Sequence, residues 1–243
     1  MIKRLFDIIC ALAGLTLSFP LLLPVILLVW LQDFHSPFYI APRVGRGHKL
    51  FRMVKLRSMI VRADKSGVDS TSAADTRITP IGHFIRAYKL DELTQLWNVL
   101  KGDMSLVGPR PNVERETVLY TEVEKHLLDI RPGITDIASI VFSDEGEILK
   151  DHEDPDIGYN QLIRPWKSRL GLIYVERCSP ILDIRLIWLT AIAIFSRNKA
   201  LKGVQKLLIS MKIDPEIQQI CSRQNSLVPH PPPGSNEIVT NRQ

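Results

Sequence analysis

Residues 8–31 read IICALAGLTLSFPLLLPVILLVWL and contain no charged side chain. A helix of roughly 20 apolar residues is long enough to cross the hydrocarbon core of a bilayer, which is about 30 Å thick. Lys3 and Arg4 resemble the basic start of a signal peptide, but the apolar run is longer than a usual signal core. No small-x-small cleavage site follows Trp30. We therefore interpret the block as a retained membrane segment.

Two prolines near the middle of the block bear on how it meets the membrane. Pro20 and Pro24 each remove a backbone donor and clash with the preceding turn, which predicts a break in the helix. The hydroxyls of Thr16 and Ser18 are candidates to satisfy the carbonyls that a break exposes to lipid. Each arm is then about a dozen residues, or roughly 18 Å, which is too short to span. The pattern predicts a re-entrant membrane hairpin over residues 1–34, with its break at Ser18, Pro20 and Pro24.

Basic residues flank the apolar block on both sides, which bears on its orientation. Lys3 and Arg4 precede it, and the residues that follow include Arg43, Arg46, Lys49, Arg52, Lys55 and Arg57. By the positive-inside rule both ends of the block prefer the cytoplasm, which favours a hairpin. A single proline-kinked span is the alternative. In either case the large domain is expected on the cytoplasmic side.

Composition and charge narrow the classes of partner. With 243 residues, 45% of them hydrophobic, the chain can form one sizeable core plus an appendage. A net charge of +5 favours anionic partners, which are phosphate-bearing small molecules, lipid head groups or nucleic acid. Aromatic residues make up 7% and mostly follow the apolar pattern, so we expect no nucleic-acid partner. The three cysteines form no CxxC pair, which fits a reducing compartment.

The rest of the chain predicts a mostly α fold with minor β structure. RVGRG and FRMVKLRSM, within residues 36–60, suggest a glycine turn and a short alternating strand or loop, and residues 63–76 an exposed loop. Helical periodicity covers residues 78–102, up to a glycine stop, and an amphipathic helix is expected at 114–128.

The second half of the chain completes the predicted domain organisation. The apolar residues 181–195 are followed by a basic run, so they suit either a core helix or a helix in the membrane interface. We expect a cytosolic, membrane-apposed domain over 35–212, including an interfacial helix at 181–210. Residues 213–243 form a C-terminal extension that we expect to be disordered from Ser222, where PHPPPG appears.

Two carboxylates stand side by side in residues 88–111, YKLDELTQLWNVLKGDMSLVGPRP. Asp91 and Glu92 lie off the apolar stripe that a helix would form, so they face a cleft or water. That stripe consists of Leu90, Leu93, Leu96, Trp97 and Leu100. Acidic residues in a first helical turn also complement the helix dipole, and this structural explanation is the commoner one for a bare Leu-Asp-Glu.

The cations around the two carboxylates favour a chemical role. Arg86 precedes the pair, Arg110 lies between two prolines, and Lys55 and Arg57 form a basic pair upstream. In a phosphoryl-transfer site, one carboxylate attacks phosphorus, another holds a divalent cation, and cations stabilise the phosphate oxygens. The planar guanidinium of arginine matches phosphate geometry. A salt-bridged surface around a helix start is the competing interpretation.

The segment LDELTQLWNVLKGDMSLVGPRP resembles the catalytic signature of the bacterial sugar transferases, the monotopic phosphoglycosyl transferases. The resemblance extends from KRLFDII and the proline-containing block, through RVGRG and FRMVKLRSM, to RPGIT and the helix after Ser179. It covers roughly residues 1–200. It implies a re-entrant membrane helix and interfacial helices carrying a small, mostly helical cytosolic domain at the cytoplasmic face of the bacterial inner membrane.

The resemblance also implies a reaction and roles for the residues. A UDP-sugar and polyprenyl phosphate (undecaprenyl phosphate) give a polyprenyl diphosphate sugar and UMP, at the first membrane step of glycan assembly. Asp91 falls at the position of the nucleophile that forms a covalent phosphosugar intermediate, and Glu92 at that of the partner that coordinates Mg²⁺ (or Mn²⁺). Arg86 and Arg110 match arginines that contact phosphate. Lys55, followed by Arg57, lies where the family has an essential basic residue.

Three departures from the family pattern limit what the resemblance implies. The break is Phe19-Pro20 rather than Ser-Pro, with Ser18 one position earlier. After RPGIT the chain reads DIASIVFSDEGEIL, where many relatives have a different segment, and we expect this loop to select the sugar. Gly171 stands where relatives often have an acid. Candidate residues of the substrate loop are Arg131, Thr135, Asp144 and Glu145, and either of the last two is a candidate to replace the missing acid.

Two other classes of protein compete with the enzyme interpretation. A membrane-anchored interaction module would explain the apolar block and the tail, but not the cluster of acids and arginines. A membrane-tethered nucleic-acid-binding protein would explain the charge, but not the scarcity of aromatic residues. The transferred sugar, the glycan pathway and the oligomeric state do not follow from the sequence, and a dimer is compatible with it.

Overall fold

A computed structural model describes residues 2–63 and 75–241, which form a mostly helical protein with two small sheets. This confirms the predicted class, mostly α with minor β. The loop expected at 63–76 falls, apart from its ends, outside the described residues.

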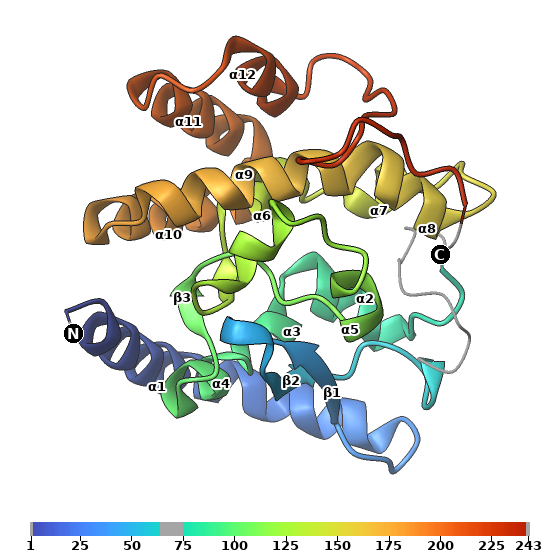
Figure 1. The fold of residues 1–243 in the computed structure, drawn as a ribbon. Coiled ribbons are helices and arrows are strands. Elements are labelled where there is room, and N and C mark those ends of the chain that lie inside the picture. The colour runs from blue at the N-terminus through green and yellow to red at the C-terminus, as the bar shows by residue number, and fades with distance from the viewer. Residues whose placement is uncertain (1, 64–74, 242–243) are drawn as a thin grey trace.

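The apolar N-terminal block forms one helix, α1 (Ile2–Leu31), which lies along one edge of the molecule (Figure 1). The helix contains both Pro20 and Pro24, so the expected division into two helical arms is wrong. A proline removes only its own donor from the helical ladder, and the hydrogen bonds on either side can continue. The two prolines therefore do not by themselves divide the block.

The hydroxyls beside the prolines bond differently from the prediction. Thr16 Oγ1 donates to the carbonyl of Leu12 at 2.9 Å, and Ser18 Oγ donates to the carbonyl of Leu15 at 3.4 Å. These acceptors lie before the proline-containing turns, so the hydroxyls make ordinary bonds within the helix. They do not bond to the carbonyls released by Pro20 or Pro24, which lie four residues before each proline.

Helix α1 is buried on one face only. Its buried residues are Asp7, Ala11, Leu22, Val25 and Val29. Large apolar side chains cover the opposite face, among them Leu12, Leu17, Phe19, Leu21, Leu23, Leu27 and Leu28. In the part of the chain that the structure describes, α1 is the one helix long and apolar enough to cross a membrane. An exposed apolar surface of this extent indicates that the protein associates with a membrane.

The N-terminal end of α1 is fixed to the domain by polar contacts. Lys3 Nζ donates to Asp183 at 2.6 Å, and Arg4 donates to the carbonyl of Leu100 at 2.8 Å. The buried Asp7 accepts from the hydroxyl of Ser105 at 2.9 Å. Lys3 and Arg4 therefore bind to the folded domain and do not point freely into solvent.

The sheets are small and lie beside the first helices. Strands β1 (Phe38–Val44) and β2 (Leu50–Leu56) form an antiparallel hairpin, joined through η1 (Arg46–His48) with Gly47 at φ 63°. This confirms the predicted glycine turn and alternating strand. Strands β3 (Ser105–Val107) and β4 (Gly133–Thr135) pair in parallel.

The backbones at Gly108 and Gly133 approach each other so closely that neither position has room for a side chain. A Cβ at Gly133 would lie 2.1 Å from the backbone nitrogen of Gly108 and 2.5 Å from its carbonyl oxygen. Gly133→Ala should therefore lower the free energy of unfolding by at least about 2 kcal/mol, measured by denaturant unfolding in detergent, because neither backbone can yield. Gly47→Ala is the control, with open space around it and a cost of about 1 kcal/mol from its positive φ alone. Equal losses in the two variants would contradict this explanation.

The periodic region that carries the acidic pair forms three short helices. They are α2 (Pro80–Ala87), α3 (Leu90–Leu93) and α4 (Leu96–Lys101), and Gly102 ends the last at φ 93°, as expected. The predicted apolar stripe fails at Trp97, which is 55% exposed while Val99 is fully buried. Because the helix is interrupted between α3 and α4, the residues of α4 do not continue the helical spacing of α3, and a different set of them faces the core.

The remaining helices build the core and its surroundings. They are α5 (Glu114–Thr117), η3 (Glu124–Leu128), α6 (Ile137–Val141), α7 (Glu145–Ile148), α8 (Pro155–Gly158), η4 (Tyr159–Ile163), α9 (Arg164–Arg177), α10 (Pro180–Phe195), α11 (Arg197–Ser210) and α12 (Pro215–Ser222). The helix expected at 114–128 is thus two short helices, since its middle is rich in β-branched residues that disfavour a helix. The largest core cluster includes buried residues of α6, α9, α10 and α11.

The helix expected at 181–210 is interrupted at Ser196, between α10 and α11. Two alternatives were expected for α10, a core helix or a helix in the membrane interface, and its two faces fit one each. Leu182, Leu186 and Leu189 are buried in the core, whereas Ile184 and Trp188 are more than half exposed.

The C-terminal extension is more ordered than its sequence suggests. Helix α12 is followed by an extended chain that lies alongside α9 (Figure 1). Pro232 and Pro233 are buried, and the ring of His230 lies 4.5 Å from that of Trp166. The expectation of disorder from Ser222 is therefore wrong for the described residues. Prolines lose little conformational freedom on docking, so a short proline-rich chain can be held by few contacts.

Candidate active site

A cavity of about 800 Å³ brings together most of the residues that the sequence singled out. Its walls come from β2, α2, α3, the Gly-Pro-Arg-Pro turn, α6 and α9. The predicted residues that line it are Lys55, Arg86, Asp91, Glu92, Arg110, Thr135 and Glu145. The carboxylate pair therefore faces a cleft, and it is surrounded by cations.

Asp91 and Lys55 form an ion pair in the lining of this cavity. Asp91 lies on α3, shortly after Lys89, whose left-handed φ of 55° separates α3 from α2. Asp91 is 9% exposed, and its Oδ2 lies 3.7 Å from Lys55 Nζ. Burial lowers the pKa of Lys55, and the charge of Asp91 opposes that shift. A further anion in the cavity would stabilise this ammonium group.

Glu92 forms a closer ion pair with Arg110, at 2.9 Å. Burial by itself would raise the pKa of Glu92, but Arg110, Lys55 and Lys89 together lower it to about 2. The same carboxylate raises the pKa of Arg110. Arg110 also donates to the carbonyl of Ile134 at 3.3 Å, so its guanidinium is held between α3 and β4.

This ion pair predicts how acid affects stability. The pKa of Glu92 is about 2 in the fold and 4.5 as an ordinary glutamate, so its stabilising effect is complete above pH 4.5 and declines as the pH falls towards 2. Arg110→Gln removes the partner, and we expect it to lower the thermal unfolding temperature most at pH 7. The difference from the wild type should shrink below pH 4.5. A difference that stays constant from pH 7 to pH 3 would contradict the assignment.

Arg86 supplies a third cation from α2. Its Nε donates to the hydroxyl of Ser58 at 3.0 Å, which fixes the direction of the guanidinium. Burial lowers the pKa of Arg86, while Asp91 and Asp75 oppose the shift. Such a partly desolvated guanidinium is well suited to bind a phosphate oxygen.

Asp136 is a further carboxylate of the cavity, and it is not among the residues predicted from the sequence. It caps the N-terminus of α6 by accepting from the backbone nitrogen and the hydroxyl of Ser139, both at 2.6 Å. Burial raises its pKa, and Ser139 and Arg110 oppose that shift. The Asp-x-x-Ser spacing after RPGIT signals a helix cap, but nothing in the sequence indicates that the cap lines a cavity.

Other cavity residues could not be found from local patterns. They include Arg43, His83, Lys89, Asn112, Glu116, Tyr120, Tyr159, Arg164, Lys167, Ser168 and Arg197. Most come from segments that only the tertiary fold brings together.

Arg57 lies outside the cavity, contrary to the phosphate-binding role predicted for it. It forms an ion pair with Asp33, just after α1, and its Nη2 lies 2.6 Å from Asp33 Oδ1. The hydrogen bond from Arg57 lowers the pKa of Asp33 to about 2. Arg57 also donates to the carbonyl of Val29 at 3.3 Å. It therefore anchors the C-terminal end of α1 to β2.

Two of the four substrate-loop candidates, Arg131 and Asp144, do not line the cavity. Arg131 donates from Nε to the carbonyl of Gly102 at 2.8 Å. Asp144 pairs with Arg197 at 2.8 Å and with Arg223 at 3.3 Å. The predicted break residues, Ser18, Pro20 and Pro24, lie on α1 and do not line the cavity.

Gly171, which stands where relatives often have an acidic residue, has little room for a side chain. A Cβ at Gly171 would lie 2.7 Å from a methyl carbon of Leu127, so a larger side chain would need Leu127 to move. Of the two candidate replacements, Glu145 lines the cavity, where it pairs with Lys167, and Asp144 does not.

The carboxylates of the cavity fit the cation that the family pattern implies. Mg²⁺ prefers oxygen ligands and is commonly held by one or two carboxylates together with substrate phosphates. Asp91, Glu92 and Asp136 supply carboxylate oxygens in one cavity. Within residues 2–63 and 75–241, no group of three or more His, Cys, Asp or Glu is arranged as a metal site. A site completed by a substrate phosphate is consistent with that arrangement.

Comparisons with known proteins agree with the family resemblance that the motif carries. A Bacillus subtilis (strain 168) protein, provisionally named an undecaprenyl-phosphate N-acetylgalactosaminyl 1-phosphate transferase, is 46% identical over 55% of this chain and 71% of its own. The UDP-galactose-lipid carrier transferase of Erwinia amylovora is 41% identical over 55% of this chain and 31% of its own. The UDP-glucose:undecaprenyl-phosphate glucose-1-phosphate transferase of Xanthomonas campestris pv. campestris is 34% identical over 82% of this chain and 40% of its own.

The chain thus spans less than half the length of the Erwinia and Xanthomonas relatives. The family model described as "Bacterial sugar transferase" matches residues 1–197, which contain α1, the hairpin, the acidic pair, the Gly-Pro-Arg-Pro turn and α10. By that match, the chain belongs to the bacterial sugar transferase family.

Proposed function

We propose that the protein transfers a sugar 1-phosphate from a UDP-sugar to polyprenyl phosphate, giving a polyprenyl diphosphate sugar and UMP. The observation that carries the proposal is the placement of the adjacent Asp91 and Glu92 against Lys55 and Arg110 in one cavity. The names of the relatives support the substrates, because they specify UDP-galactose, UDP-glucose, a lipid carrier and undecaprenyl phosphate.

In the first step, an Asp91 carboxylate oxygen attacks the phosphorus that bears the sugar. A bond forms between that oxygen and phosphorus, the bond from phosphorus to the bridging oxygen breaks, and UMP leaves with the electron pair. Lys55, which is 3.7 Å from Asp91, and the nearby Arg110 would stabilise the negative charge on the phosphoryl oxygens. The step leaves the sugar phosphate on Asp91.

In the second step, a phosphate oxygen of polyprenyl phosphate attacks the same phosphorus. The bond between phosphorus and Asp91 breaks, which restores the carboxylate and releases the lipid-linked product. A covalent intermediate allows the water-soluble donor and the lipid acceptor to use the cavity in turn. This suits a small domain that lies against a membrane.

Glu92 is the residue we propose to hold Mg²⁺ (or Mn²⁺), with Asp91 and the substrate phosphates beside it. When bound, the cation would neutralise charge on the diphosphate. Glu92 is held ionised by Arg110, Lys55 and Lys89, so it is ready to bind a cation without first losing a proton.

The proposed topology places both ends of α1 at the cytoplasmic face of the bacterial inner membrane. Lys3 and Arg4 contact the domain at one end of the helix, and Asp33 contacts Arg57 just beyond the other. The two ends therefore bind the same folded unit, whereas a full span would place one of them across the bilayer. This supports a monotopic membrane helix without requiring a sharp break at the prolines.

Cysteine labelling tests the topology. In a variant in which Cys10, Cys178 and Cys221 are replaced by serine or alanine, single cysteines at residues 2 and 46 should both resist a membrane-impermeant thiol reagent in intact cells. Both should react once the membrane is permeabilised, because both positions are exposed on the protein. Reaction at residue 2 alone in intact cells would indicate a full span and overturn the proposal.

Sugar selection is proposed to rest with two cavity residues, Thr135 at the end of β4 and Glu145 at the start of α7. Thr135 and Glu145 line the cavity, whereas Arg131 bonds to the backbone carbonyl of Gly102 and Asp144 pairs with the side chains of Arg197 and Arg223. The direct assay of the proposed function is release of UMP from a panel of UDP-sugars with polyprenyl phosphate and Mg²⁺. Release from at least one sugar nucleotide is expected. If none is consumed, a membrane-anchored interaction module becomes the better interpretation.

A further inference from the structure

The C-terminal chain lies outside the segment that matches the family, yet it is bonded to the core of the domain. The family match ends at residue 197. Beyond α12, the backbone nitrogen of His230 donates to the carbonyl of Gln161 at 3.0 Å, and Gln161 Nε2 donates to the carbonyl of Val239 at 2.7 Å. Both contacts hold the chain against η4, the turn that leads into α9.

A second set of contacts holds the proline-rich part of this chain. Arg169 Nη1 donates to the carbonyl of Pro231 at 3.0 Å, and the hydroxyl of Thr121 donates to the carbonyl of Pro233 at 2.5 Å. Pro233 is buried, and a Cβ at Gly234 would lie 2.7 Å from a methyl carbon of Val123. The chain thus bridges α9 and the loop before η3.

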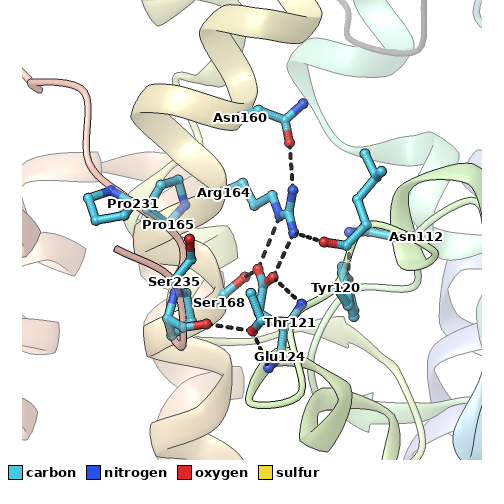
Figure 2. A network of polar contacts seen from close by, with 12 residues as sticks. Asn112, Tyr120, Thr121, Glu124, Asn160, Arg164, Pro165, Ser168, Pro231 and Ser235 are labelled. Atoms are coloured by element: carbon cyan, nitrogen blue, oxygen red, sulfur yellow. Dashed lines mark hydrogen bonds and ion pairs between the residues drawn. The ribbon is translucent and has the colours of Figure 1, made fainter. Parts of the chain in front are cut away.

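Thr121 connects the C-terminal chain to a buried ion pair (Figure 2). The backbone nitrogen of Thr121 donates to Glu124 Oε2 at 3.1 Å, and its hydroxyl accepts from the backbone nitrogen of Glu124 at 3.1 Å. Glu124 is fully buried and pairs with Arg164 at 2.6 Å. Ser168 also donates to Glu124, at 2.7 Å.

The buried ion pair in turn supports a wall of the cavity. Arg164 and Tyr120 both line the cavity, and the Arg164 guanidinium lies 5.7 Å from the centre of the Tyr120 ring. Arg164 also donates to the carbonyl of Leu119 at 2.6 Å, and to Asn160 at 3.1 Å. These bonds, together with those to Glu124, leave the Arg164 guanidinium with little freedom to turn. The network of Figure 2 therefore fixes the position of this part of the cavity wall.

We propose that residues 229–239 act as a strap that positions the Tyr120–Arg164 wall to bind the UDP-sugar. The inference rests on the proposed function and concerns a different side of the same cavity. Lys55, Arg86 and Arg110 supply the cations for the phosphates. The Tyr120–Arg164 wall offers the Tyr120 ring with its hydroxyl, and the charge of the Arg164 guanidinium is already balanced by Glu124. The wall therefore suits the part of the donor that carries no phosphate, either the base and ribose or the sugar.

The strap is a positioning element and not a catalytic one. Its contacts reach the cavity through Thr121, Glu124 and Arg164, and none of those contacts involves Asp91. Loss of the strap should therefore weaken donor binding while leaving the chemical step intact. In kinetic terms, KM should rise and kcat should hardly change.

The test compares the full chain with two altered forms. One ends at Val228, which removes the strap but keeps Arg223 and its ion pair with Asp144. The other carries Gly234→Ala, which forces a side chain towards Val123 and Thr121 at a φ of 83°. We expect KM for the UDP-sugar to rise on the order of tenfold in the truncated form, and kcat to stay within about twofold. Asn236→Ala is the matched control, since its side chain is exposed and makes no hydrogen bond within residues 2–63 and 75–241.

A peptide of residues 229–243, added to the truncated protein, should lower KM again, which a general loss of folding would not allow. Inhibition by UDP identifies the part of the donor involved. If truncation raises the inhibition constant of UDP as much as it raises KM, the wall binds the nucleotide. If the inhibition constant does not change, the wall binds the sugar.

Two results would overturn the inference. One is an unchanged KM in both altered forms, and the other is a joint loss of kcat and donor affinity that the peptide does not restore. Failure of the proposed function itself looks different, because the full chain would then release no UMP from any UDP-sugar.

Discussion

Asp91→Asn should lower the rate of UMP release by at least about 1,000-fold, because an amide cannot form the bond to phosphorus that the proposed first step requires. Asp91 lies in the cavity beside Lys55, and its neighbours Glu92 and Arg110 form their own ion pair. The substitution therefore removes the attacking group while retaining the surrounding charges. Steady-state assays with saturating UDP-sugar, polyprenyl phosphate and Mg²⁺ measure the effect.

For Asp91→Asn, a loss of catalytic activity has to be distinguished from a loss of folding. Asparagine has nearly the volume of aspartate, so the thermal unfolding temperature should stay close to that of the wild type. Glu116→Gln is a useful control, since it also removes a carboxylate from the cavity wall but not from the proposed nucleophile. An Asp91→Asn enzyme with a tenth or more of the wild-type rate would exclude Asp91 as the nucleophile.

Arg164→Met should cost about 3–5 kcal/mol in the free energy of unfolding, the largest loss of stability that we expect from a single side chain. Its partner Glu124 is fully buried, and the substitution would leave that carboxylate without the guanidinium that compensates it. The contacts from Arg164 to Asn160 and Leu119 would be lost as well. Denaturant unfolding in detergent measures the change.

Adding Glu124→Leu to that variant distinguishes the ion pair from the packing around it. Removal of both charges leaves no unpaired ion, so we expect the double variant to regain a large part of the lost stability. Arg169→Met is the single-site control, because this neighbouring cation on α9 bonds to backbone carbonyls and forms no ion pair within the described parts of the chain. A loss below about 1 kcal/mol for Arg164→Met would contradict the role given to this pair.

The acidic pair was predictable from sequence because its evidence is local. Asp91 and Glu92 are adjacent, they fall off an apolar stripe, and the turn that holds Arg110 between prolines follows within about twenty residues. The cavity then brings Lys55 and Arg86 to the same place. Likewise the strands of the hairpin and the stop at Gly102 depend on glycine and alternation, which are visible without the fold.

Other features depend on contacts that the sequence does not display. Arg57 is one position beyond a strand whose Lys55 faces the cavity, yet an ion pair with Asp33 directs it to α1. Trp97 continues an apolar period, but the interruption between α3 and α4 turns it outwards. The tail is proline-rich and polar, and its order comes from acceptors on Gln161 and donors such as Thr121 that lie far away in the chain.

The most direct test of the central claim is to detect the covalent intermediate. The purified protein is incubated with Mg²⁺ and a UDP-sugar labelled in the sugar, without polyprenyl phosphate, and examined by intact-protein and peptide mass spectrometry. We predict a single added sugar phosphate on the peptide that contains Asp91, an equal amount of released UMP, and loss of the adduct when polyprenyl phosphate is added. An enzyme that turns over the complete mixture but never carries the label, or carries it on another residue, would contradict the account.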